Sequence, residues 1–237
     1  MILVVVGASW VLAQKIPIHA NNRFPLKSAE HGIDGWIQVV TDARLTEDLQ
    51  KKMWGIGDWT FVLTEDDPRA RAFSAKPPAN AKLQILDSSG QVTKSFVLER
   101  PLARIEKARL RPDHETFLVT VDYSIGMGSY AGPSTSLLEV ENGNFAWLKA
   151  TDSANHKDEP IQLAHTLKSD WKLVPFQHNR DILEILCRPD APMSGDFVIH
   201  YVRYRFTNGK WIRFERTKKG IWESDESFPP SSSFPQS

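Results

Sequence analysis

The chain has 237 residues, a length that suits one large β domain and allows a sizeable buried core. Its 29 basic and 29 acidic residues cancel, so there is no net field to attract nucleic acid or an anionic membrane surface. The single cysteine, Cys187, excludes a scaffold of internal disulfides, and its place in an alternating apolar segment predicts a buried strand residue. We therefore expect a globular protein without a nucleic-acid partner.

Residues 1–13 have the composition of the apolar core of a secretory signal peptide. They are too few to cross a bilayer, which takes about 20 apolar residues. Val11-Leu12-Ala13 suits cleavage before Gln14, although the basic residues that normally precede the apolar core are missing. A buried first strand is the alternative. We predict a truncated signal peptide, export to the periplasm or cell surface, and no integral membrane segment in the mature chain.

A short strand is expected at 36–40, and the pattern then changes to a helical one over 42–54. There Leu45, Leu49 and Met53 recur at helical spacing, with acidic residues early in the segment and lysines late, which suits the helix dipole. This is the one short helix that the sequence predicts.

The rest of the chain alternates in the manner of β-strands, bounded by turn residues. Strands are expected at 58–65, 81–87, 92–99, 104–110, 116–124, 134–141, 144–150, 169–176, 181–187, 196–207, 210–216 and 220–224.

Three tight hairpins are predicted where a Gly-containing turn separates two such strands. The turns are Asp87-Ser88-Ser89-Gly90, Asn142-Gly143 and Asn208-Gly209. Asn-Gly favours a type I′ turn because both residues tolerate the positive φ that this turn requires. The recurrence of this unit predicts an all-β fold built from antiparallel meanders.

Grouped by turns, the strands form about three meanders that end near 100, 150 and 216. This pattern resembles the blades of a β-propeller, although no family signature accompanies it. Three blade-like units do not close a ring, which leaves three alternatives. The fold is a β-sandwich, or it has a fourth sheet made by Trp36–Val40 and Gly220–Glu223, or the chain is a fragment of a larger propeller. We expect a single β-rich domain over 14–226 and a Pro/Ser-rich tail over 227–237 that is disordered or loosely docked.

The segment 203–219 is locally basic. In a hairpin of period two, such charges are typical of a solvated face opposite Tyr204, Phe206 and Ile212. We therefore expect the arginines and lysines of this hairpin to lie in water.

The segment 122–135 is the predicted ligand-binding site. It leaves a strong strand and combines glycines, which let a backbone approach a ligand closely, with hydroxyl groups and two tyrosines. The candidate residues are Asp122, Tyr123, Ser124, Gly126, Gly128, Ser129, Tyr130 and Gly132.

The sequence predicts no metal site and no cofactor. None of the seven histidines has the spacing of a metal-binding motif, and one cysteine excludes a thiolate-rich zinc site. Nucleophile-elbow and phosphate-loop motifs are missing as well.

By exclusion, we expect a non-catalytic binding or interaction module with an unidentified ligand or protein partner. The alternative is a hydrolase acting on a glycan or peptide through carboxylates at strand ends, for which Asp122, Asp152 and Glu184 are the candidates.

Overall fold

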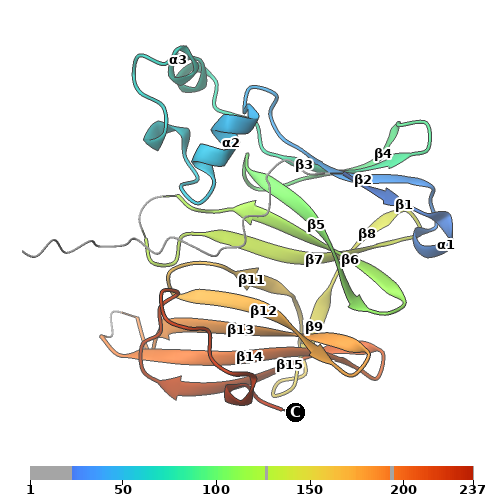
Figure 1. Ribbon diagram of the computed structural model, residues 1–237, viewed down its shortest axis with the longest axis vertical. Coiled ribbons are helices and arrows are strands. Elements are labelled where there is room, and N and C mark those ends of the chain that lie inside the picture. The colour runs from blue at the N-terminus through green and yellow to red at the C-terminus, as the bar shows by residue number, and fades with distance from the viewer. Residues whose placement is uncertain (1–22, 126–127, 193–194, 237) are drawn as a thin grey trace, which may run out of the picture.

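The computed structural model describes residues 23–125, 128–192 and 195–236. Three β-sheets lie one above the other, as Figure 1 shows, and nearly all of their strand pairs are antiparallel. The all-β class expected from the sequence is therefore confirmed. The signal peptide predicted for residues 1–13 lies outside the described residues.

The first sheet, sheet A, has the strand order β1-β2-β3-β4. A short helix joins β1 to β2, and a small helical insertion separates β2 from β3. The elements are β1 (Arg23–Leu26), α1 (Ser28–His31), β2 (Gly35–Val40), α2 (Glu47–Met53), η1 (Trp59–Phe61), α3 (Pro68–Ala75), β3 (Lys82–Asp87) and β4 (Val92–Val97).

Sheet B has the order β11-β7-β6-β5, with β8 also paired to β7, and sheet C has the order β10-β9-β15-β14-β13-β12. The single parallel contact among the described strand pairs joins β9 to β15. Sheet B contains β5 (Ala103–Arg111), β6 (His114–Asp122), β7 (Pro133–Glu141), β8 (Asn144–Trp147) and β11 (Gln162–Ala164). Sheet C contains β9 (Lys149–Asp152), β10 (Asp158–Pro160), β12 (Ser169–Phe176), β13 (Asn179–Pro189), β14 (Phe197–Thr207) and β15 (Lys210–Lys219), and η2 (Ser231–Ser233) follows it.

Sheet B is the middle layer and is buried on both faces. Along β6, Phe117 and Val119 join the core shared with sheet A, whereas Leu118 joins the core shared with sheet C. A strand covered on both sides needs residues that tolerate burial at nearly every position, which explains why Phe117–Val119 are consecutive apolar residues.

The helical insertion differs from the sequence prediction. Helix α2 lies within the expected segment, but α3 is a second helix of the insertion, which contradicts the expectation of one helix. The strand predicted at 58–65 is wrong, because the Asp58 side chain accepts from the backbone N–H of Thr60 and begins η1 instead. Asp67 caps α3 in the same way, and Pro68 occupies its first turn.

The strand expected at 36–40 forms as β2, but the one expected at 220–224 does not. Strand β2 pairs with β1 and β3, so it does not form a sheet with the segment 220–224. That segment is irregular, and its Trp222 is buried against the outer face of sheet C instead.

The predicted hairpin turns are confirmed. Asn142 and Gly143 have φ of 49° and 71°, and Asn208 and Gly209 have φ of 51° and 78°, so both central residues are left-handed as a type I′ turn requires. Gly90 is also left-handed, and the register of β3 and β4 shifts between Ile85 and Leu86, just before this turn.

Replacing Gly209 by Val should lower the free energy of unfolding by about 1 kcal/mol or more, because a β-branched residue fits positive φ badly. A Cβ atom at this position would meet no atom within 4 Å. A loss of stability would therefore come from the strained backbone conformation and not from a steric clash. Chemical denaturation measures the change. Gly209→Asn is the matched control and should cost less, since Asn tolerates this region. Equal stability of the Val variant and the wild type would contradict the turn type.

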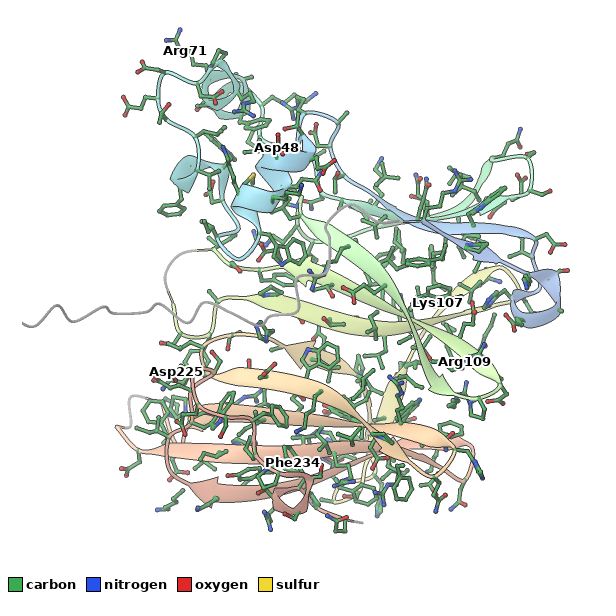
Figure 2. All side chains as sticks on the ribbon, viewed as in Figure 1. Asp48, Arg71, Lys107, Arg109, Asp225 and Phe234 are labelled. Atoms are coloured by element: carbon green, nitrogen blue, oxygen red, sulfur yellow. The ribbon has the colours of Figure 1, made fainter. Side chains whose placement is uncertain are left out.

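The C-terminal tail is packed, which corrects the expectation of disorder. Phe234 is 1% exposed and contacts Tyr201 edge-on, while Phe228 stacks on Phe234. Together they cover the apolar outer face of sheet C, where Figure 2 places Phe234. Burial of two phenylalanines offsets the entropy lost by a Pro/Ser-rich segment.

The covered face also carries charges that the sequence analysis assigned to solvent. Arg203 is 4% exposed and donates from Nη1 to Oδ2 of Asp181 at 2.7 Å. Arg205 donates to the same carboxylate from Nε and Nη2. The solvated-face prediction is therefore wrong for these two arginines, because the tail excludes water from them.

Candidate functional site

The described residues of four connecting segments lie at the same end of the sheet stack, on the left in Figure 1: 54–61, 123–125 with 128–132, 165–168 and 220–226. Each contacts the next. A Cβ atom on Gly57 would lie 2.3 Å from the carbonyl oxygen of Ser124, and one on Gly132 would lie 2.1 Å from that of His165. The N–H of Ser224 donates to the carbonyl oxygen of Leu167 at 2.8 Å. Close backbone contact thus fixes the four segments relative to one another.

These segments expose large apolar side chains to water. We call them the loop-end surface: Ile56, Phe61, Ile125, Tyr130, Leu167 and Ile221, which are 40% to 62% exposed. Scattered exposed apolar residues are ordinary, but a group of them at one end of a molecule is typical of a contact surface.

Asp122, the first predicted site residue, has a structural role. It is 2% exposed, its Oδ2 accepts from the N–H of Gly55 at 2.8 Å, and its Oδ1 accepts from the N–H of Ser124 at 2.9 Å. Ser124 is buried as well. Both residues tie the helical insertion to the end of β6, Asp122 through the N–H of Gly55 and Ser124 through close approach to Gly57.

Tyr123 is half-buried, and its hydroxyl donates to Oε2 of Glu99 at 2.9 Å. Burial, followed by the contact with Glu99, raises the pKa of this phenol to about 12, so it stays protonated at neutral pH. Its hydroxyl is thus engaged within the fold.

Gly128, Ser129, Tyr130 and Gly132 form the turn before β7. The N–H of Ala131 donates to the carbonyl oxygen of Gly128, which leaves Tyr130 52% exposed at the tip, with Ser129 beside it. Position 132 requires glycine, because a Cβ atom there would collide with the carbonyl oxygen of His165. Gly126 lies outside the described residues. Tyr130 is therefore the predicted residue that the structure places on the exposed surface most clearly.

Four members of the loop-end surface were missed by sequence reasoning: Ile56, Phe61, Leu167 and Ile221. Ile56, Leu167 and Ile221 lie in turns or irregular segments, and Phe61 ends η1. Because strands were expected over Phe61 and Ile221, the local pattern gave no signal for these two, and only the fold places all four at one end of the molecule.

Asp152 and Glu184, the other carboxylates named for hydrolysis, are buried and hydrogen-bonded to groups of the fold. Asp152 accepts from two backbone N–H groups and from Nη1 of Arg213 at 2.8 Å. Glu184 is 2% exposed and accepts from the N–H of Ala164 and the hydroxyl of Tyr204. Burial raises the pKa of Glu184 to about 7.

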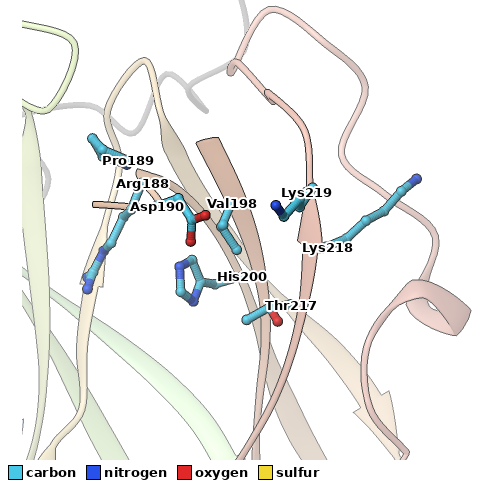
Figure 3. A pocket seen from close by; sticks show the side chains of 8 residues that line it. All are labelled: Arg188, Pro189, Asp190, Val198, His200, Thr217, Lys218 and Lys219. Carbon is cyan, nitrogen blue, oxygen red and sulfur yellow. The ribbon is translucent and has the colours of Figure 1, made fainter. Parts of the chain in front are cut away.

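A shallow pocket of about 570 Å³ lies on β13, β14 and β15 (Figure 3). Cationic side chains predominate around it, and His200 at its floor has Nδ1 2.5 Å from Oε1 of Glu215. It is lined by Arg188, Pro189, Asp190, Val198, His200, Thr217, Lys218 and Lys219. Because Glu215 already engages the histidine, the pocket presents a basic rim more than a reactive group.

No family model matches the chain, and searches of curated proteins and of solved structures give no significant match. In the part of the chain that the structure describes, every helix is too short or too polar to span a membrane.

Proposed function

We propose that this protein is a non-catalytic interaction module that binds a protein partner through the loop-end surface. The observation that carries the proposal is the group of exposed apolar side chains on four mutually braced segments. Apolar and aromatic side chains held by a rigid frame lose little entropy on binding and commonly supply most of the affinity of an interface. Tyr130 and Phe61 are the aromatic members.

The place of action in this proposal is the periplasm or the cell surface. The composition of residues 1–13 supports export. The balanced charge of the chain fits recognition by apolar contact better than steering by a strong electrostatic field.

The alternative of a glycan or peptide hydrolase finds less support. Asp122, Asp152 and Glu184 are each buried and hydrogen-bonded to groups of the fold. A hydrolytic pair instead needs two carboxylates about 5 to 10 Å apart on either side of an accessible substrate.

We also propose how the three sheets are arranged. Three meander sheets packed face to face suit a propeller-like arrangement, which would be completed by strands from outside the described chain. The outer strand of sheet A supports this, because Val92, Phe96 and Val97 on β4 are 44% to 57% exposed. Exposed apolar edge strands are ready to pair with further chain.

The test uses a photo-crosslinking residue placed at Tyr130 or Leu167, in the cells that produce the protein naturally. We expect both positions to form an adduct with the same protein, and Lys210, an exposed residue of the β14–β15 turn, to form none. Equal adducts from all three positions, or adducts from none, would contradict the proposal.

Tyr130→Ala separates binding from folding. The variant should unfold within about 0.5 kcal/mol of the wild type, because the side chain is exposed. Its affinity for the crosslinked partner should fall about tenfold or more. A large loss of stability would instead make Tyr130 a core residue.

A further inference from the structure

A buried histidine at the end of α1 has one ring nitrogen without a partner. His31 is 3% exposed, and its Nδ1 lies 3.2 Å from the carbonyl oxygen of Val140. A carbonyl can only accept, so Nδ1 carries the proton in the neutral ring and Nε2 carries the lone pair. Nε2 makes no hydrogen bond to any group in the described residues. A buried, unpaired acceptor of this kind is costly unless something else occupies its lone pair.

Two carboxylates face this nitrogen. Oε2 of Glu115, on β6, lies 3.5 Å from Nε2, which is longer than a normal hydrogen bond, and Oε2 of Glu30 lies 3.8 Å from it. One ligand atom from each of the three residues lies within 4.8 Å of the others. Ligands about 2.0 to 2.1 Å from a tetrahedral zinc ion stand about 3.3 Å apart, so small side-chain movements suffice to hold an ion.

Lys107 leaves this arrangement intact. Its Nζ lies 2.8 Å from Oε1 of Glu115, whereas the contact with His31 is made by the other carboxylate oxygen, Oε2. Figure 2 shows Lys107 on β5. Oε2 of Glu115 therefore stays available to an ion beside Nε2 of His31.

We propose that Glu30, His31 and Glu115 bind a divalent transition-metal ion of the zinc type. One imidazole nitrogen with two carboxylate oxygens suits zinc, whereas calcium takes six to eight oxygen ligands. The hydrogen bond from Nδ1 to Val140 is the usual outer contact that orients a metal-binding histidine. Glu30 is 43% exposed, so water completes the coordination from that side.

The ion would join two layers of the fold. Glu30 and His31 belong to the helix between β1 and β2 of sheet A, and Glu115 belongs to sheet B. A metal bound across them favours the folded state over the unfolded chain and raises apparent stability. This proposal is independent of the loop-end surface.

The test is calorimetric titration of the full chain, stripped with a chelator, with Zn²⁺ and then with Co²⁺. We expect one ion per chain with Kd of about 1 μM or tighter, a higher melting temperature with Zn²⁺, and the visible absorption of tetrahedral or five-coordinate Co²⁺. Ca²⁺ and Mg²⁺ at the same concentration should leave the melting temperature unchanged.

Variants assign the site. Glu30→Gln, at an exposed position that should not disturb folding, is expected to weaken Zn²⁺ binding tenfold or more, and His31→Gln should abolish it. His114→Gln is the matched control, because this exposed histidine precedes Glu115 but lies outside the cluster. No binding by the wild type, or equal binding by all variants, would overturn the proposal.

Discussion

Replacing Asp181 by Asn is expected to lower the free energy of unfolding by about 3 to 5 kcal/mol. The carboxylate is 1% exposed and is the shared acceptor of Arg203 and Arg205. Without it, two guanidinium groups stay desolvated and lose their counter-ion. The same arginines donate to the carbonyl oxygens of Ser231 and Gln236, so the variant should also loosen the tail.

Chemical denaturation of the variant measures the stability loss, and limited proteolysis measures the release of the tail. Glu47→Gln is the matched control, because it breaks an ion pair with Lys51 in which both side chains are about half exposed. Exposed pairs of this kind contribute about 0 to 1 kcal/mol. A loss below about 1 kcal/mol for Asp181→Asn would show that water reaches the two arginines.

The second large effect is a dependence of stability on pH through Glu184. Its pKa is about 7 in the folded protein, because burial between sheets B and C disfavours the charged form, and about 4.5 in the unfolded chain. The folded state therefore holds this proton more tightly. Stability from this group is fully present below pH 4.5, falls as the pH rises, and is lost above about pH 7. At about 1.4 kcal/mol per pH unit, the free energy of unfolding falls by about 3 kcal/mol across this pH range.

Glu184→Gln should remove this slope, because a neutral amide keeps an acceptor for Ala164 and a polar contact for Tyr204. We expect the variant to equal or exceed the wild type at pH 8 and to gain nothing at pH 4. Urea denaturation across this range gives the comparison, and Glu159→Gln, on exposed β10, should follow the wild-type curve. Parallel curves for wild type and Glu184→Gln would mean that Glu184 titrates normally.

The sequence was less informative about the candidate site than about the fold. It led to Tyr130 through the glycine-rich segment, but it also named Asp122, whose carboxylate accepts hydrogen bonds from within the fold. One donor is the N–H of Gly55 in the helical insertion, and no local pattern reveals a partner so distant in the chain.

The proposed metal ligands were missed for a related reason. Motif spacing finds ligands that share one helix or loop, whereas Glu30 and His31 meet Glu115 only because sheet A lies on sheet B. The histidine itself looked ordinary in the sequence, since its burial and its free nitrogen are properties of the packed structure.

Local chemistry alone determined the all-β class and the turns. Asn142-Gly143 and Asn208-Gly209 turn where they do because these residues tolerate positive φ, and strand alternation follows from the pleat. Tertiary structure alone decided which faces lose contact with water. Phe228 and Phe234 cover sheet C because burial of apolar area depends on the whole surface available, and this covering converts Arg203 and Arg205 from solvated charges into a buried cluster with Asp181.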